Sequence, residues 1–144
     1  MHGDAREVIG SGGTDPTETH LYRMALDRGE VARLTEGAGS HGGKFARDGG
    51  IWVHQASMLN GDVRHVVRGR DSLALFEIPS VASDPPFVPN LELARISAGG
   101  RIYHAAIVRP RNFDPSKKYP VIDYVYGGPG HPVVTASARA YFRQ

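Results

Sequence analysis

Turn signals recur about every ten residues through the first 80 residues of the chain, and this spacing restricts the possible folds more than any other feature. The separators are rich in Gly, Pro, Asn and Asp, and Asn60-Gly61-Asp62 is a strong signal for a β-hairpin. We therefore expect an all-β region of antiparallel hairpins. The expected strands span residues 7–10, 20–26, 31–34, 44–47, 51–56, 63–68 and 73–78.

Four aromatic side chains lie in these predicted strands: Tyr22, Phe45, Trp52 and Phe76. An aromatic residue in a strand is more often part of the core than a contact for a ligand. We therefore predict that these four rings pack in the core of the sheets.

A proline-rich stretch at residues 80–90 divides the chain. It carries Pro85, Pro86 and Pro89, and proline cannot sit inside a central strand, so we expect a linker here. The charge balance changes at the same place. Residues 1–83 hold 9 Lys and Arg against 11 Asp and Glu, whereas residues 84–144 hold 8 against 4. The predicted regions are therefore 1–83 and 84–144.

The second region begins as β structure and then changes class. Residues 91–97 and 101–108 predict a hairpin around Ala98-Gly99-Gly100, and a loop follows at 110–119. Residues 121–126 are almost wholly apolar or aromatic, which is typical of a strand buried on both faces of a parallel sheet. Residues 135–144 have helical character. We therefore expect the beginning of an α/β fold.

The composition excludes several kinds of partner and site. The 144 residues carry a net charge of +2 with scattered basic residues, so we expect no nucleic-acid partner. The chain has no Cys, and its seven His lack the spacing of a helical metal site, so we expect no metal and no cofactor. No apolar run approaches the roughly 18 residues of a membrane helix, and the first residues lack the pattern of a signal peptide.

Two glycine motifs in the first region have alternative interpretations. The glycine spacing of residues 37–42 matches a dinucleotide fingerprint, yet a strand and a turn follow where that motif requires a helix. His41-Gly42-Gly43 is similar to the oxyanion loop of lipases. Because antiparallel hairpins surround both motifs, we interpret residues 37–43 as an ordinary glycine turn.

The best candidate for a functional site lies at the end of the predicted buried strand. It ends at Tyr126 and continues into the glycine-rich turn 127–130, the place where open α/β sheets bind ligands. The phenol of Tyr126 is protonated at neutral pH and can donate a hydrogen bond to a developing oxyanion. Alternatively, Tyr126 merely packs over the turn. The spacing alone leaves both interpretations open.

Two motifs in residues 110–130, Ser116-Lys117-Lys118-Tyr119-Pro120 and Val125-Tyr126-Gly127-Gly128-Pro129-Gly130, carry a resemblance to a known family. They resemble the start of the catalytic domain of the prolyl oligopeptidase family, in its dipeptidyl peptidase IV branch. Residues 15–23 and 45–49 are similar to the closing propeller strands of that branch. The resemblance implies the C-terminal part of a β-propeller at 1–83 and a truncated α/β-hydrolase domain at 84–144.

The resemblance also implies an activity. The family cleaves peptides through a Ser-Asp-His triad, and this branch removes N-terminal dipeptides with Pro or Ala in second place. Tyr126 matches the tyrosine that helps to form the oxyanion hole, beside a substrate-proximal loop of Gly127, Gly128, Pro129 and Gly130. No serine of the chain lies in a Gly-x-Ser-x-Gly elbow, so we expect the triad to lie outside residues 1–144 and the chain alone to be inactive.

Several features of the parent protein are implied by resemblance alone. Bacterial members of the branch are often homodimers, and are often periplasmic or secreted. The glutamates that bind the substrate's amino terminus belong to an earlier part of the propeller. Two other functions remain open on the sequence: a free-standing β-rich binding module, and a non-peptidase α/β-hydrolase such as an esterase.

Overall fold

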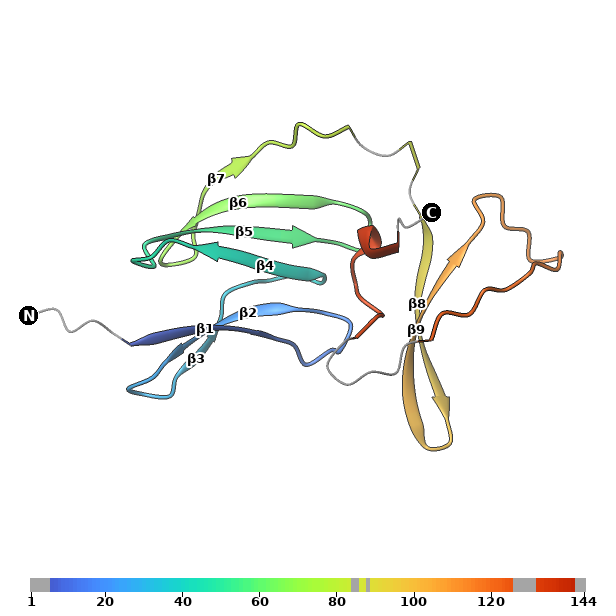
Figure 1. Ribbon diagram of the computed structural model, residues 1–144, viewed down its shortest axis with the longest axis horizontal. Coiled ribbons are helices and arrows are strands. Elements are labelled where there is room, and N and C mark those ends of the chain that lie inside the picture. Colours follow the sequence, from blue (N-terminus) through green and yellow to red (C-terminus); the bar gives the residue numbers. More distant parts are fainter. Residues whose placement is uncertain (1–5, 84–85, 88, 126–131, 142–144) are drawn as a thin grey trace, which may run out of the picture.

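The computed structural model describes residues 6–83, 86–87, 89–125 and 132–141. Within them the chain forms three antiparallel sheets (Figure 1). The first has the order β1-β2-β3, the second β4-β5-β6-β7, and the third pairs β8 with β9. The bounds are β1 Glu7–Gly12, β2 His20–Ala25, β3 Val31–Arg33, β4 Ser40–Phe45, β5 Ile51–Ser57, β6 Val63–Gly69, β7 Ala74–Ile78, β8 Asn90–Ala98 and β9 Arg101–Arg109.

The predicted turn residues build the hairpins between these strands. In the β4–β5 turn, the Asp48 carboxylate accepts a hydrogen bond from the Gly50 amide at 3.0 Å, and Gly49 adopts a φ of 67°. In the β5–β6 turn, the Asn60 side chain accepts the Asp62 amide at 3.0 Å. Side chains of this kind replace backbone hydrogen bonds in tight turns, so the sequence fixes where each hairpin reverses.

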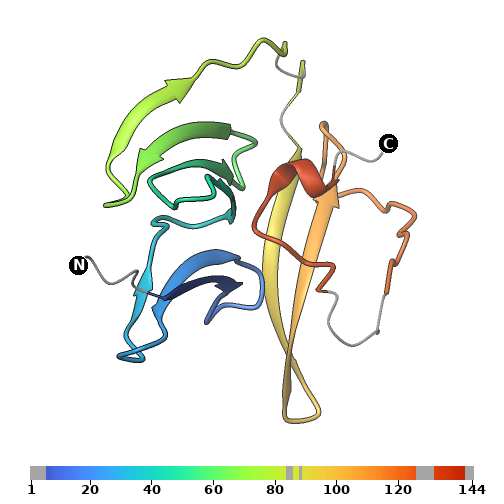
Figure 2. The ribbon, with the colours of Figure 1, turned by 60° about the vertical axis from the view of Figure 1, so that its left-hand side comes forward.

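The first two sheets lie side by side and share one small core (Figure 2). Thr19 and Ser40 form an isolated parallel bridge between them, in which the Thr19 amide donates to Gly39 O at 3.2 Å and the His41 amide donates to Thr19 O at 2.8 Å. Leu21, Leu34 and Trp52 form the buried apolar cluster beside this bridge. We call this junction the seam between the sheets.

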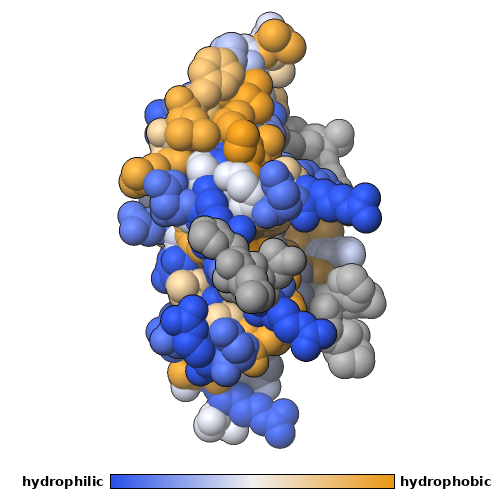
Figure 3. Space-filling model, turned by 90° about the vertical axis from the view of Figure 1, so that its left-hand side faces the viewer, coloured by the Kyte–Doolittle hydropathy of each residue, from blue (hydrophilic) through white to orange (hydrophobic). Residues whose placement is uncertain are grey.

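The predicted aromatic core is confirmed for two rings and wrong for one. Trp52 is only 1% exposed, and its ring stacks on Phe45 with centroids 4.9 Å apart. Tyr22 is half-buried. Phe76, by contrast, is 59% exposed, because β7 is the edge strand of its sheet and all its residues are exposed. Figure 3 shows apolar surface gathered at the top of the view, the side on which β7 lies in Figure 1.

The glycine-rich stretch expected as a turn is largely strand. β4 begins at Ser40, so His41-Gly42-Gly43 pairs with β5 and is neither a lipase-type oxyanion loop nor a nucleotide loop. The physical reason lies at Gly43. A Cβ there would come within 2.8 Å of Leu21 Cδ1 and 3.0 Å of Phe45 Cε2. Glycine is needed at this position for close packing against the core.

The second region forms its predicted hairpin, with Gly99 and Gly100 at positive φ in the turn between β8 and β9. The expected buried strand is absent from the described residues 121–125. They form no ladder, and Ile122 is 96% exposed. An apolar run becomes a strand only when neighbours supply its hydrogen bonds, and a parallel neighbour needs a long crossover connection.

The expected helix at 135–144 is also reduced. Its described part contains one turn of 3₁₀-helix, η1, at Ala138–Tyr141. The α/β-hydrolase architecture therefore remains an expectation, and the described fold is antiparallel β. No helix in the described ranges is long and apolar enough to cross a membrane.

Candidate functional site

The predicted site residues Tyr126, Gly127, Gly128, Pro129 and Gly130 lie outside the described residues. The chain on both sides of this turn is described, however, and shows how its ends are held. The two sides differ sharply. The preceding loop contacts β9 through Phe113, which lies under Arg109, and residues 121–125 are exposed, whereas the following residues bond to the loops of the first two sheets.

The loop before the turn is folded on itself. The Asp114 carboxylate accepts hydrogen bonds from the Ser116 hydroxyl at 2.7 Å and the Ser116 amide at 3.0 Å, and these bonds lower the pKa of Asp114. The Tyr119 ring packs against Phe113, and its hydroxyl accepts the Asp114 amide at 3.0 Å. The Lys117-Lys118-Tyr119 motif therefore closes a compact loop, from which residues 121–125 extend into solvent.

The segment after the turn is anchored to the first two sheets. The Ala136 amide donates to Thr17 O at 2.7 Å, and the Ala138 amide donates to Met58 O at 3.1 Å. Between them, the hydroxyls of Ser57 and Ser137 share a hydrogen bond of 2.6 Å. Ala136, Ser137 and Ala138 are all buried. This anchor fixes the carboxyl side of the glycine-rich turn to the loop before β2 and to the end of β5.

The nucleophile of a serine peptidase needs a neighbouring base. Ser57 and Ser137 bond to each other, and neither bonds to a histidine in the described part of the chain. One hydroxyl does meet an imidazole: Thr35 Oγ1 lies 3.2 Å from His20 Nδ1, and His20 Nε2 lies 3.1 Å from Glu18 Oε2. Thr35 is 1% exposed and its hydroxyl accepts the Leu21 amide. A substrate cannot reach it, so this arrangement is structural.

Three buried histidines, which the sequence did not bring together as one group, meet at the seam. His20 comes from β2, His41 from β4 and His54 from β5, and they are 2%, 4% and 5% exposed. The His20 and His41 ring centroids lie 4.8 Å apart, and those of His41 and His54 lie 5.2 Å apart. We call these three residues the histidine stack.

Hydrogen bonds set the tautomers of two members of the stack. Arg68 Nε can only donate, so His54 Nδ1 accepts its hydrogen bond at 3.2 Å. His54 Nε2 then carries the proton and donates to His41 Nδ1 at 3.0 Å. His41 Nε2 in turn donates to Gly37 O at 3.2 Å. Both rings are therefore neutral, and each nitrogen has a single role.

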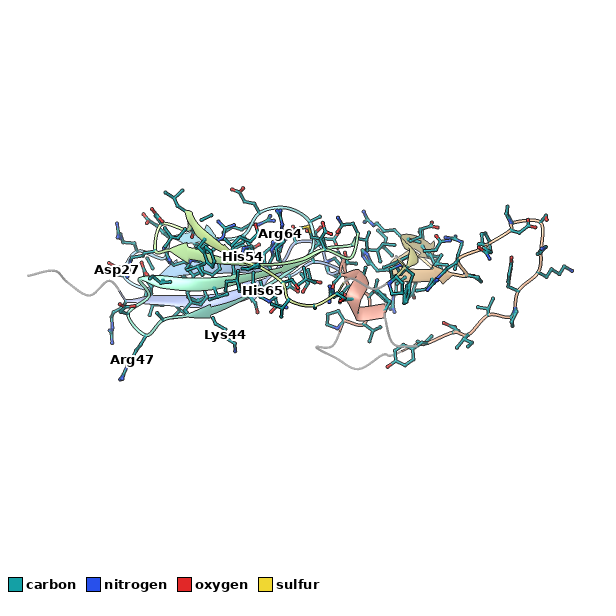
Figure 4. The ribbon with its side chains drawn as sticks, turned by 90° about the horizontal axis from the view of Figure 1, so that it is seen from above. Asp27, Lys44, Arg47, His54, Arg64 and His65 are labelled. Carbon is teal, nitrogen blue, oxygen red and sulfur yellow. The ribbon has the colours of Figure 1, made fainter. Side chains whose placement is uncertain are left out.

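Burial and nearby positive charge keep these rings neutral. Desolvation, together with the smaller effects of Arg68 and His41, lowers the pKa of His54 to about 4. Desolvation also lowers the pKa of His41, against a smaller opposing effect of its hydrogen bond to Gly37. Figure 4 shows His54 lying among the strands, whereas Lys44 and Arg47 point outward. No group of His, Asp and Glu in the described ranges is arranged to hold a metal ion.

Comparisons with known proteins agree with the motifs. No protein-family profile matches the chain. The chain is 30% identical over 138 residues to a protein of Schizosaccharomyces pombe named as a dipeptidyl aminopeptidase, and 27% identical over 139 residues to a dipeptidyl-aminopeptidase B of Coccidioides posadasii. Each match covers 90% of this chain but only 17% and 15% of the relatives.

The fold has a solved counterpart of the same kind. The chain matches the crystal structure of Porphyromonas gingivalis dipeptidyl peptidase 4 with a TM-score of 0.75 and 19% sequence identity. The match covers 92% of this chain and 20% of that structure. In sequence, the chain is therefore similar to one segment of proteins named as dipeptidyl aminopeptidases, and its fold is similar to one segment of the P. gingivalis structure.

Proposed function

We propose that the chain is the part of a serine-type dipeptidyl peptidase that joins the end of a β-propeller, at residues 1–83, to the start of an α/β-hydrolase domain, at residues 84–144. The observation that carries this proposal is the similarity to dipeptidyl aminopeptidases over 90% of the chain. The Ser-Asp-His triad is contributed from outside residues 1–144. The peptides cleaved have Pro or Ala in second place, and the complete enzyme is a homodimer.

The arrangement of the described elements supports this assignment. Two sheets of short antiparallel strands share a seam, as neighbouring blades of a propeller do. A third hairpin, β8–β9, follows the proline-rich stretch. Ile122 and Val125 are strongly exposed, as side chains awaiting the neighbouring strands and helices of an α/β sheet would be.

Tyr126 supplies one step of the proposed reaction. The triad histidine takes the proton of the serine hydroxyl, whose oxygen attacks the carbonyl carbon of the scissile bond. Negative charge develops on the carbonyl oxygen, and the Tyr126 hydroxyl donates a hydrogen bond to it. The histidine then protonates the leaving amine, and water later releases the dipeptide from the serine. The turn 127–130 lets the main chain approach the substrate closely.

The test of this role is Tyr126→Phe in the complete polypeptide. Phe keeps the ring and removes the donor, so kcat for an Ala-Pro chromogenic substrate should fall about 100- to 1000-fold, or about 3 to 4 kcal/mol, with KM nearly unchanged. Tyr124→Phe is the matched control because it removes the neighbouring phenol, and it should change kcat little. A Tyr126→Phe enzyme that keeps more than about a third of kcat would contradict the oxyanion role.

A further inference from the structure

The histidine stack crosses the seam between the first two sheets. His20 belongs to the three-stranded sheet, whereas His41 and His54 belong to the four-stranded sheet. The seam also contains the Thr19–Ser40 bridge and the Leu21, Leu34 and Trp52 cluster. Arg70 of the four-stranded side bonds to Glu7 and Arg23 of the three-stranded sheet, and residues 136–138 bond to Thr17 and Met58 on the two sides. Among these contacts, the stack is the one that places titratable rings from both sheets against each other.

The hydrogen bonds along the stack run in one direction. Arg68 donates to His54, His54 donates to His41, and His41 donates to Gly37 O. On the other side of the seam, His20 Nε2 lies 3.1 Å from Glu18 Oε2 and His20 Nδ1 lies 3.2 Å from Thr35 Oγ1. Arg33 Nη2 lies 3.1 Å from Nδ1 and 3.0 Å from Nε2 of the same ring. Both ring nitrogens of His54 and of His41 are used, so neither of these two rings can take up a proton without losing an existing hydrogen bond.

A proton added to this arrangement has no good position. On His54 it would go to Nδ1 and face the Arg68 guanidinium, which is a donor and a cation. On His41 it would go to Nδ1 and face the donor Nε2 of His54. In both cases a hydrogen bond becomes a contact between two donors, and a charge is created in a buried place.

The charged groups around the stack do not compensate for such a charge. His41 faces His20 from β2, Arg33 from β3, Glu18 from the loop before β2, and His54 from β5. His54 faces Arg68 from β6 and His41 from β4. Glu18 is the single carboxylate among these groups, and it already binds His20 at 3.1 Å.

We propose that the histidine stack is an acid-sensitive joint, in which proton uptake by His41 and His54 separates the three-stranded sheet from the four-stranded sheet while each sheet keeps its own strand pairing. The ladders can survive because their hydrogen bonds are between backbone groups within one sheet. The seam cannot, because its stacked rings must move apart to solvate the new charges.

The direction of the effect follows from the pKa values. The pKa of His54 is lowered from 6.5 to about 4, and the pKa of His41 is lowered as well. A histidine with a depressed folded pKa stabilises the closed seam fully above the unfolded pKa, and this stability is lost as the pH falls toward the folded pKa. The opening constant should therefore rise between about pH 6.5 and pH 4, by up to about 300-fold for His54 alone.

Spin labels can test this joint directly because the chain has no native Cys. One label pair, at Ala32→Cys on β3 and Glu77→Cys on β7, spans the seam. These two sites and Lys44, the third label site, are all exposed. The other pair, Lys44→Cys and Glu77→Cys, lies within the four-stranded sheet. Double electron-electron resonance on samples frozen at pH 7.5 and 4.5 gives the distance distribution of each pair.

We expect the pair across the seam to show a narrow distribution at pH 7.5 and a longer, broad component at pH 4.5, with the pair inside one sheet unchanged. His54→Gln keeps a donor toward His41 and cannot be protonated, so it should reduce the acid-induced component. His65→Gln on β6, outside the stack, is the matched control and should respond as the unsubstituted chain does.

Three results would overturn the proposal that the stack is an acid-sensitive joint. The first is a distribution across the seam that is the same at both pH values, or already broad at pH 7.5. The second is equal broadening of both label pairs, which would show general acid unfolding. The third is an acid response of His54→Gln equal to that of the His65→Gln control.

Discussion

At the scale of single residues, the seam depends on a glycine as much as on its large side chains. Gly43 lies in β4 opposite His54, in contact distance of Leu21, Phe45 and Trp52. The neighbouring Gly42 has no atom within 4 Å of the position where a Cβ would stand. The two glycines therefore differ in their surroundings although they are adjacent in the sequence.

Gly43→Ala should destabilise the chain by about 1 to 3 kcal/mol, because the added methyl group overpacks the core. A Cβ would approach Trp52 Cε3 to 3.3 Å in addition to the shorter contacts with Leu21 and Phe45. Gly42→Ala should be neutral or slightly stabilising, since it reduces the freedom of the unfolded chain at an open site. Urea unfolding followed by Trp52 fluorescence measures both, and equal midpoints for the two variants would refute this account.

The sequence predicts that Trp52 is buried in the core but does not predict the histidine stack, for a physical reason. Trp52, His54 and Ala56 alternate along β5 with exposed or half-buried neighbours, so a period of two could have identified His54 as inward-facing. Nothing in the sequence shows that His20 and His41 stack on one another, because this contact forms between separate sheets. The prediction that Phe76 packs in the core was wrong for a related reason. Aromatic content does not distinguish an edge strand from a central strand.

At the scale of elements, the strands of the sheets were predictable because turn residues punctuate them. Asp48-Gly49-Gly50 and Asn60-Gly61-Asp62 each reverse the chain where expected. Residues 40–43 were assigned wrongly because they belong to β4, where Gly43 serves for close packing rather than for a turn. At residues 121–125 the error is the reverse, because a strand is predicted and none is observed. Their apolar pattern predicts a strand, but the pairing depends on neighbours that the described residues do not provide.

The stretch between β7 and β8 begins with exposed residues that we expect proteases to reach first. Residues 80–83 are exposed, with Val81 fully so, and their amides take no part in a ladder. Limited digestion with proteinase K should therefore cut first within residues 80–90, because an extended, exposed segment fits a protease most easily. Mass spectrometry of the first fragments identifies the site. A first cut inside β4–β6, with residues 80–90 intact, would show that the linker assignment is wrong.

At the scale of the whole molecule, the described residues leave much apolar surface uncovered. It has a small buried core around Trp52, while exposed apolar side chains cover β7 and residues 121–125. It also spans only 17% of the S. pombe relative and 20% of the P. gingivalis structure. Under the proposed function, further propeller blades and an α/β-hydrolase domain cover these surfaces in the complete polypeptide.

The most direct test of the proposed peptidase uses a fluorophosphonate probe, which labels activated serines, on the complete polypeptide and on the 144-residue chain. The complete polypeptide should release N-terminal dipeptides and carry the label on one serine outside residues 1–144. The 144-residue chain should remain unlabelled and should not cleave Ala-Pro substrates above the buffer rate. A labelled serine within residues 1–144, or a complete polypeptide that releases no dipeptide, would contradict the account.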